Sequence, residues 1–576
     1  MGGRGEGLTQ WAGFAQGGSR VTTSRTDVGG DVLRGERDGL AATEGRRFPL
    51  IHRSDTALLV LATASILVAA VILRLVALGK IGFNSDEAVY SGQAAALAGD
   101  EELGRYFSPF RAHPLLVQTL LAVLFRVVGV SDVAARTLVA LAFGVGGIAA
   151  AIFLARRLYG WGVALIAGLI LALVPYHVIL SRQVMLDVAL AMGVTLTLLA
   201  TYRYFESGRT AWLLLSASLA GLATLAKETG ILLIPVMLLF LLWVGRLRRL
   251  KLRYVVSWGT LYTLTVLPFA ATRLLFETGT THGFFLYQVS REPNHAWWYF
   301  PIILWESLGP PVVVTALVGL IIMAVRRRAE DKLVLSWLFI FGTFFQVWPT
   351  KLFPYLIAIA PALTIASAIG VLDTVRLATR ALRPIWTRIL SVAATIVLGA
   401  TLVPPSLLAA TEGVERYEGP FSLDVEVQDF AGGREVGRWV GENTPEGSVF
   451  LTIGPSMGNL LSFYGQRDWF ALSVNRDPTK RNPAYRPIVN PDLEIRQLQI
   501  HYAVWDAYSA DRSAFFNASL MRTVRSHGGT PVFAAWLGAG RQVKTGRALP
   551  PGVQARVVVY SLPGGDPTGA SSAPVS

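Results

Sequence analysis

About eleven apolar runs, each near the length needed to cross a bilayer, divide the first 410 residues and constrain the fold more than any other feature. They lie at residues 56–78, 133–155, 161–180, 187–205, 211–226, 230–245, 254–272, 302–325, 333–349, 354–373 and 389–410. A helix needs about 20 apolar residues to span the hydrocarbon core. With 52% hydrophobic and only 16% charged residues, the chain is expected to be a polytopic α-helical membrane protein.

Basic clusters set the expected topology. A shorter run at residues 114–130 contains Arg126, and we interpret it as a helix lying in the outer interface. Without a crossing there, the clusters at 156–157, 246–253, 326–328 and 376–388 all fall on the side of the N-terminal tail, as the positive-inside rule requires. The net charge of +14 then reflects loops that face anionic membrane lipids. No nucleic-acid partner is expected.

Composition divides the chain into four parts. Residues 1–50 are expected to be a disordered cytoplasmic tail because they contain few large apolar residues. Residues 51–410 form the transmembrane domain, residues 411–565 an extracytoplasmic α/β domain and residues 566–576 a flexible tail. Within the third part, helices are predicted at 434–443, 456–464 and 510–526, and strands at 448–453, 501–505, 531–536 and 553–562. The chain has no cysteine, which excludes disulfides, thiol catalysis and cysteine-ligated metals.

One polar stretch, residues 79–90, follows the first apolar run and contains the adjacent carboxylates Asp86 and Glu87. Such a pair at a membrane boundary can act as a base or hold a divalent cation such as Mg, Mn or Zn. The alternative is structural: Asn84 can cap a helix with Glu87 at its third position, and the helix dipole favours both acids.

Other polar residues fall on the same outer face in the expected topology. They are His113, Arg182, Asp187, Lys227, Lys351 and Tyr355, together with His282, Arg291 and His295 in an aromatic-rich loop at 280–301. Isolated cations there can hold a lipid phosphate. The alternatives are snorkelling of Arg or Lys side chains, helix capping by Asp187 and an interfacial aromatic belt in the loop.

The order of five short motifs resembles that of the GT-C membrane glycosyltransferases, in the branch of protein O-mannosyltransferases and lipid A aminoarabinose transferases (glycosyltransferase family 39 type). The motifs are Asn84-Ser-Asp-Glu-Ala-Val-Tyr90, His113-Pro114, Ser181-Arg-Gln-Val-Met-Leu-Asp187, Lys227-Glu-Thr-Gly230 and Lys351-Leu-Phe-Pro-Tyr355. The resemblance covers residues 56–410. Two departures are Leu115, where protein mannosyltransferases usually have a second Pro, and a loop at 273–300 too short for their lumenal insertion.

The resemblance implies an inverting glycosyltransferase that moves a sugar from a polyprenyl-phosphate donor to an acceptor hydroxyl on a protein, lipid or glycan, outside the cell membrane. It implies that Asp86 is the catalytic Asp and Glu87 its acidic neighbour, with His113-Pro114 a motif later in the same loop. Arg182 and Asp187 match a second loop, so Asp187 is a further catalytic candidate, and Lys351 and Tyr355 match a donor-side motif. Two other classes remain open: a secondary transporter, although no inverted repeat is visible, and a membrane-anchored sensor with an exterior domain. The signatures of ATP-driven transport, zinc proteolysis and serine hydrolysis are absent from the sequence.

Overall fold

The computed structural model describes residues 53–109, 113–247, 251–275, 284, 287–411, 430–536, 539–542 and 555–563. It divides the chain into two units, Met1–Val60 and Leu61–Ser576, and the first is described only over the opening turns of one helix. The predicted tails at 1–50 and 566–576 lie outside the described residues. All other described residues belong to the second unit.

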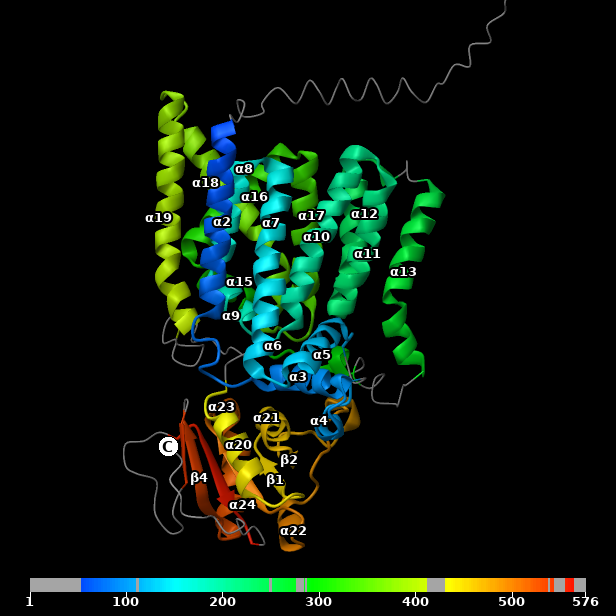
Figure 1. Ribbon diagram of the computed structural model, residues 1–576, viewed down its shortest axis with the longest axis vertical. Helices are drawn as coiled ribbons and strands as arrows, with labels where there is room; N and C mark the ends of the chain where they lie inside the picture. Colours follow the sequence, from blue (N-terminus) through cyan, green and yellow to red (C-terminus); the bar gives the residue numbers. More distant parts are fainter. Residues whose placement is uncertain are drawn as a thin grey trace, which may run out of the picture. The chain divides into compact units, whose positions relative to one another are not determined.

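Helices form most of this unit (Figure 1). Up to residue 411 they are α2 (Arg53–Leu75), α3 (Ser85–Ala98), α4 (Glu101–Tyr106), α5 (Leu116–Val128), α6 (Asp132–Leu138), the π-helix η2 (Val139–Val145), α7 (Gly146–Tyr159), α8 (Trp161–Leu173), α9 (Pro175–Ser181), α10 (Leu186–Ser207), α11 (Thr210–Ala226), the 3₁₀-helix η3 (Glu228–Leu232), α12 (Leu233–Trp243), α13 (Leu252–Leu275), α15 (Tyr299–Leu308), α16 (Pro310–Arg326), α17 (Ala329–Val347), the 3₁₀-helix η5 (Phe353–Ile359), α18 (Ala360–Ala378) and α19 (Pro384–Thr411).

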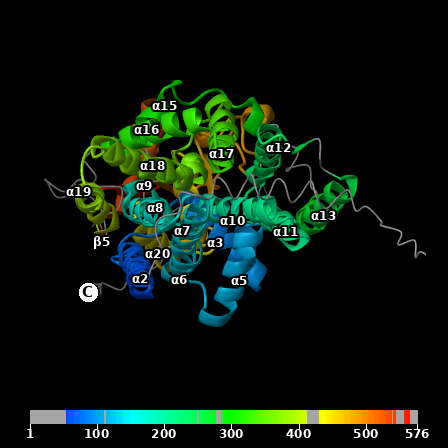
Figure 2. The same cartoon turned by 90° about the horizontal axis from the view of Figure 1, so that it is seen from above.

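Six helices among the described residues are long and apolar enough to cross a membrane, and the number rises to eight if each of two bent pairs is one span. The multi-pass membrane architecture is therefore confirmed, whereas the count of eleven stays a prediction. Seen from above, α10 lies between α7 and α11 (Figure 2), and it packs against both.

Two predicted runs are broken, at positions that the sequence explains. The run at 161–180 bends by 62° between α8 and α9, where Pro175 begins α9. The run at 302–325 bends by 113° between α15 and α16, where Gly309 adopts a φ of 87° before Pro310. Pro cannot donate the helical hydrogen bond, and glycine accepts this left-handed backbone without strain.

Arg74 compensates for the first break. Pro175 leaves the carbonyl of Leu171, four residues earlier, without its helical donor. The fully buried Arg74 guanidinium donates to that carbonyl at 3.5 Å and to the carbonyl of Ala172 at 2.8 Å. It also lies 2.8 Å from Nδ1 of His177. Arg74 is thus a structural residue, as a buried arginine in an apolar run requires hydrogen-bond partners.

The short helices α3 to α6 gather at the end of the bundle nearest the sheet (Figure 1). The segment predicted to lie in the interface forms α5, whose 13 residues span only about 20 Å at 1.5 Å per residue, less than the hydrocarbon core. Its buried face packs against α3. Its length therefore supports the interfacial interpretation.

Residues from 430 onward form a six-stranded sheet with the order β2-β1-β3-β6-β4-β5. The elements are α20 (Gly433–Asn443), β1 (Val449–Thr452), α21 (Pro455–Gly465), β2 (Asp468–Ala471), the 3₁₀-helix η6 (Pro478–Lys480), α22 (Pro491–Arg496), β3 (Tyr502–Asp506), α23 (Ala507–Arg512), α24 (Ala514–Ser526), β4 (Thr530–Trp536), β5 (Ala539–Gln542) and β6 (Val557–Ser561). Strands β2, β1 and β3 are parallel, and β6 runs antiparallel to both β3 and β4.

The strands and helices predicted here from the sequence are present, within a few residues of their expected bounds. The helix predicted at 510–526 is two helices, since Ser513 ends α23 and caps α24 by accepting from the backbone N–H of Phe516. Strands β2 and β5 and helix α22, of four to six residues each, were not predicted.

Candidate active site

The two adjacent carboxylates at the start of α3, Asp86 and Glu87, have different environments. Asn84 is the N-cap, and it forms a capping box with Glu87 through bonds of 3.0 Å in each direction. Glu87 is fully buried, and its oxygens also accept from Arg136 at 2.5 and 2.8 Å and from the backbone N–H of Val184 at 2.9 Å. Glu87 therefore joins three segments, and its carboxylate has no oxygen left to face a substrate.

Asp86 has a different environment. Its side chain is exposed at the first turn of α3, and no described residue forms an ion pair with it. The protein atoms packed around it nevertheless desolvate the carboxylate, which raises the pKa of Asp86 above its usual value of 3.8. The charges of His113, Lys227 and Arg291 oppose this rise in pKa, and that of Asp187 adds to it. Asp86 thus lies in one electrostatic neighbourhood with four other predicted site residues.

One ion pair and one histidine–carboxylate contact organise that neighbourhood. Lys227, which ends α11, donates to both oxygens of Asp187 in α10 at 2.7 and 2.8 Å, and its ammonium lies 4.9 Å from the ring centroid of Tyr355. Nδ1 of His113 lies 2.9 Å from a carboxylate oxygen of Glu228. Because Lys227 and Glu228 are adjacent in the sequence, they connect Asp187 in α10 with His113 in the segment before α5.

Arg291 and Lys351 are cations without carboxylate partners among the described residues. Arg291 has a long hydrogen bond to Gln288, 3.4 Å, and lies 5.6 Å from the ring of Tyr287. Lys351 is 5% exposed, and its Nζ lies 5.9 Å from the ring of Trp297 with no hydrogen-bond acceptor in the described part of the chain. Its backbone is fixed by Asn294, which bonds to its N–H at 2.8 Å and to its carbonyl at 3.1 Å.

The remaining members of the aromatic loop are less informative. His295 stacks on Tyr299 with the ring centroids 3.9 Å apart. His282 lies outside the described residues. The paired bonds of Asn294 fasten the loop beside Lys351, so Arg291 and Lys351 belong to neighbouring segments.

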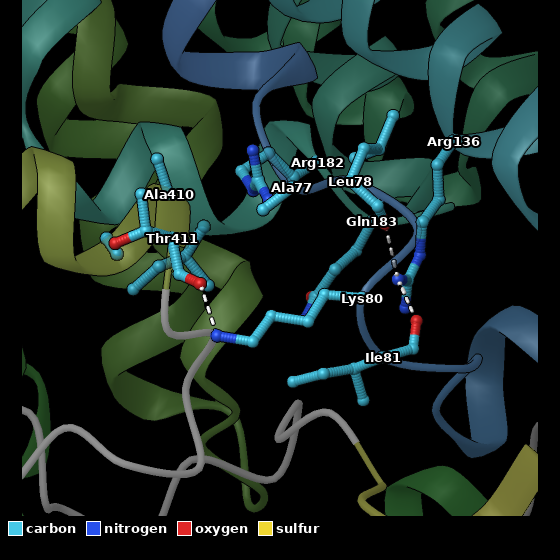
Figure 3. Close-up of a pocket in the computed structure, with 11 residues that line it drawn as sticks. Ala77, Leu78, Lys80, Ile81, Arg136, Arg182, Gln183, Ala410 and Thr411 are labelled. Atoms are coloured by element: carbon cyan, nitrogen blue, oxygen red, sulfur yellow. Dashed lines mark hydrogen bonds between the residues drawn. The ribbon is translucent and has the colours of Figure 1, made fainter. Parts of the chain in front are cut away.

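Arg182 lies elsewhere. Its Nη1 donates to the carbonyls of Leu73, Arg74 and Val76 at 2.8 to 3.1 Å, so it caps the C-terminal end of α2. It lines a small pocket with Lys80, Arg136 and Thr411 (Figure 3), in which Lys80 reaches the carbonyl of Thr411 at 3.0 Å. The structure therefore does not bring Arg182 together with Asp86.

The sheet-containing domain supports the loop that carries Asp86. The hydroxyl of Tyr464 in α21 accepts from the backbone N–H of Phe83 at 2.9 Å and donates to Asp132 at 3.2 Å. Asn459 in the same helix donates to Ser85 Oγ at 3.0 Å. A Cβ on Gly82 would lie 2.5 Å from Cβ of Arg434, so glycine permits this close approach of loop and domain.

A metal held by Asp86 and Glu87 does not fit this geometry, because the oxygens of Glu87 already accept from Arg136, Val184 and Asn84. Among the described residues no three His, Asp or Glu side chains form a group suited to a metal ion. No step is therefore assigned to a metal.

Sequence reasoning missed several partners that complete the arrangement. In the sequence Arg136 is one of many scattered basic residues, Glu228 is only part of a motif, and Asn294, Asn459 and Tyr464 carry no signal. A buried glutamate requires a counter-charge, but the burial of Glu87 and the choice of Arg136 as its partner are both seen only in the structure.

Solved structures show which class of fold this is. ArnT from Cupriavidus metallidurans bound to undecaprenyl phosphate matches with a TM-score of 0.62 at 17% identity, over 88% of this chain and 98% of that one. AglB from Archaeoglobus fulgidus, in complex with an inhibitory peptide and a dolichol-phosphate, matches with a TM-score of 0.54 at 13% identity, over 90% and 77%. The fold is that of the GT-C membrane glycosyltransferases.

A family model matches part of the chain. Residues 112–274 match the family described as dolichyl-phosphate-mannose-protein mannosyltransferase, and this segment contains His113, Asp187 and Lys227. No curated protein gives a significant sequence match. The resemblance to GT-C glycosyltransferases is thus confirmed by the fold and by this family match.

Proposed function

We propose that this protein transfers a sugar from a polyprenyl-phosphate-linked donor to an acceptor hydroxyl on the outer face of the membrane, with inversion at the anomeric carbon. One observation supports this most directly: Asp86 is a carboxylate without an ion-pair partner among the described residues, in the electrostatic field of His113, Lys227 and Arg291. Such a site contains a base for the incoming hydroxyl and cations for a departing phosphate.

Asp86 is the general base of the proposed reaction. The acceptor oxygen attacks the anomeric carbon while the bond from that carbon to the phosphate oxygen breaks, and the acceptor proton passes to Asp86. A raised pKa makes the ionised Asp86 a stronger base than an ordinary aspartate at neutral pH. Glu87 acts through position: its bonds to Arg136 and Val184 fix the first turn of α3 and so aim Asp86.

The departing polyprenyl phosphate is an anion, and cations aimed at it stabilise the transition state. Lys351 and Arg291 are proposed for this role because neither has a carboxylate partner in the described chain. The Lys227 charge is already compensated by Asp187 at 2.7 Å. We assign that buried pair, with Tyr355 beside it, to orienting the sugar by hydrogen bonds.

The donor class is suggested by two relatives: ArnT was solved with undecaprenyl phosphate and AglB with a dolichol-phosphate. A single displacement requires the acceptor and the phosphate on opposite faces of the sugar. The proposed base lies in α3 and the proposed phosphate cations lie in the aromatic loop and at Lys351, so separate segments of the chain are assigned to the acceptor and to the phosphate.

The test is a deletion strain complemented with either wild-type protein or the Asp86→Asn variant, followed by intact-lipid mass spectrometry and glycan analysis. We expect one polyprenyl-phosphate sugar to accumulate, and one glycan, lipid or protein to lose that sugar, in both the deletion and the Asp86→Asn strain. An unchanged pool of lipid-linked sugars in the deletion strain would contradict the proposal.

The same experiment distinguishes the proposed glycosyltransferase from the alternative of a secondary transporter. A transporter would move its substrate intact, so its loss would redistribute a compound without removing a glycosidic product. The intracellular and extracellular pools measured in the same strains distinguish the two outcomes.

A further inference from the structure

The segment between β2 and α22, residues 475–489, contains four cations and one acid. The cations are Arg476, Lys480, Arg481 and Arg486, and the acid is Asp477. Arg476, Lys480 and Arg486 are exposed. We call residues 475–489 the basic segment.

Asp477 does not neutralise these cations. Its Oδ1 accepts from the backbone N–H of Thr479 at 2.9 Å and from its hydroxyl at 2.8 Å, and these bonds lower the pKa of Asp477. In the part of the chain that the structure describes, no carboxylate forms an ion pair with Arg476, Arg481 or Arg486. Lys480 alone approaches an acid, Glu292, at 3.5 Å between two largely exposed side chains. Exposed pairs of this kind contribute little, so the segment keeps a net positive charge.

The basic segment is fixed beside the proposed site at two points. The hydroxyl of Tyr485 accepts from Asn459 at 3.1 Å, and the same amide of Asn459 donates to Ser85, the residue before Asp86. At the other end, Lys480 reaches Glu292, which follows Arg291 in the aromatic loop. The basic segment therefore connects, through Tyr485 and Lys480, to both the segment that carries Asp86 and the loop that carries Arg291.

Charge at this place acts on whatever approaches Asp86 from outside the bundle. The guanidinium groups of Arg476 and Arg481 donate to the backbone carbonyls of Val489 and Arg476, which carry no net charge. Cations without carboxylate partners attract anions, concentrate them locally and speed their encounter with the site. The lipid-linked donor is proposed to be held by Arg291 and Lys351, which leaves the acceptor as the substrate for the basic segment to bind.

We propose that the basic segment is an acceptor-binding subsite and that the acceptor carries phosphate or carboxylate groups close to its reacting hydroxyl. This inference rests on the proposed glycosyltransferase function and specifies its acceptor class. Arg476 and Arg486 are the principal contacts because both are exposed and neither has an acidic partner in the described chain.

The probe pair is a fluorescent tetragalacturonate and its methyl-esterified form, which has the same size without the charges. Binding is measured by fluorescence anisotropy to the full chain in nanodiscs of neutral phosphatidylcholine. The test variant is Arg476→Gln with Arg486→Gln. The matched control is Arg522→Gln with Arg525→Gln, which removes the same charge from exposed positions of α24.

We expect wild-type protein to bind the charged oligosaccharide about tenfold more tightly than the ester at about 50 mM salt, and the preference to fall as salt rises to about 300 mM. The preference should disappear in the test variant and persist in the control. Equal affinities for the two probes, or a preference that the test variant retains, would overturn the proposal.

Two further measurements distinguish acceptor binding from binding of the donor and from binding of membrane lipid. Binding of polyprenyl phosphate should be unchanged in the test variant; if wild-type protein does not bind it, the proposed function fails while the acceptor preference is judged on its own data. Native mass spectrometry in nanodiscs with phosphatidylglycerol tests the membrane. If wild-type protein retains more of this lipid than the test variant and shows no oligosaccharide preference, the segment binds lipid headgroups and the acceptor assignment is wrong.

Discussion

Asp86→Asn and Glu87→Gln are expected to have opposite effects, although both changes turn a carboxylate into an amide in the same helical turn. Asp86 has no ion-pair partner among the described residues, and its raised pKa means that folding disfavours its ionised form. Asn removes that cost and loses a helix-dipole interaction of about 0.3–1 kcal/mol. The net change in stability should therefore stay within about 1 kcal/mol. Loss of the general base should lower turnover by about 10²- to 10⁴-fold, or about 2.7–5.5 kcal/mol in activation free energy.

Glu87→Gln removes the counter-charge of Arg136, which is 4% exposed, and replaces an acceptor of the Val184 N–H. Breaking a buried ion pair costs about 3–5 kcal/mol because the remaining charge stays desolvated. This variant should therefore fail through unfolding. Any properly folded fraction should keep much of its activity per molecule.

The assay is release of polyprenyl phosphate from a lipid-linked sugar by purified protein, measured together with the melting temperature. Glu102→Gln, at an exposed position of the neighbouring α4, is the control and should change neither quantity. The reasoning is refuted if Asp86→Asn keeps near-wild-type turnover. It is also refuted if Glu87→Gln melts like wild type while losing all activity.

Single contacts give three more predictions. Lys351→Gln should weaken polyprenyl-phosphate binding by about 10- to 100-fold, which is the value of one charged hydrogen bond, without changing the melting temperature. Arg182→Gln should have the opposite pattern, with a lower melting temperature and an unchanged affinity. Equilibrium binding and thermal melting of both variants test these expectations. Tyr464→Phe leaves the Phe83 N–H without an acceptor and should lower the stability by about 1–3 kcal/mol. It should also slow turnover, and an unchanged kcat would show that the sheet-containing domain does not support the loop that carries Asp86. The acid limb of kcat/KM should lie above pH 3.8, because protonated Asp86 cannot accept a proton, and the limb should vanish in the residual activity of Asp86→Asn. The stability of the fold depends on pH in the opposite direction. Because folding raises the pKa of Asp86, the folded state gains stability as the pH falls through that pKa. Activity should therefore be lost at a higher pH than the folded structure.

Much of the helical fold could be predicted from the sequence because a bilayer imposes a minimum length on each apolar run. The bend at Pro175 could also be predicted from the sequence, since the missing N–H of proline is a local property. The residue that donates to the freed carbonyl could not be predicted. Arg74 lies 97 residues before Leu171, and nothing in either local sequence specifies that pairing.

The candidate site, like the fold, could be predicted from the sequence only in part. His113, Lys227 and Asp86 come from different loops, and the structure brings them together because alternate loops of a helical bundle lie at the same end. The residue types alone did not distinguish Asp86 from Glu87, since both suit a first helical turn; the family resemblance is what assigned the catalytic role to Asp86. In the structure Arg136 separates them, because it engages Glu87 and leaves Asp86 exposed.

The bond from the Phe83 N–H to Tyr464 joins residues 381 positions apart, and this separation has a consequence for biosynthesis. At about 5–20 residues per second, the ribosome needs about 20–75 s after making Phe83 to reach Tyr464. During that time the loop that presents Asp86 has already been made, but the helix that holds it has not. Nascent chains therefore acquire an ordered loop around the proposed base only when the sheet-containing domain has folded onto them. A chain that stops at residue 411 is therefore expected to insert into the membrane and to lack the proposed activity, and the same is expected of a chain that ends before β6, the strand that pairs with both β3 and β4.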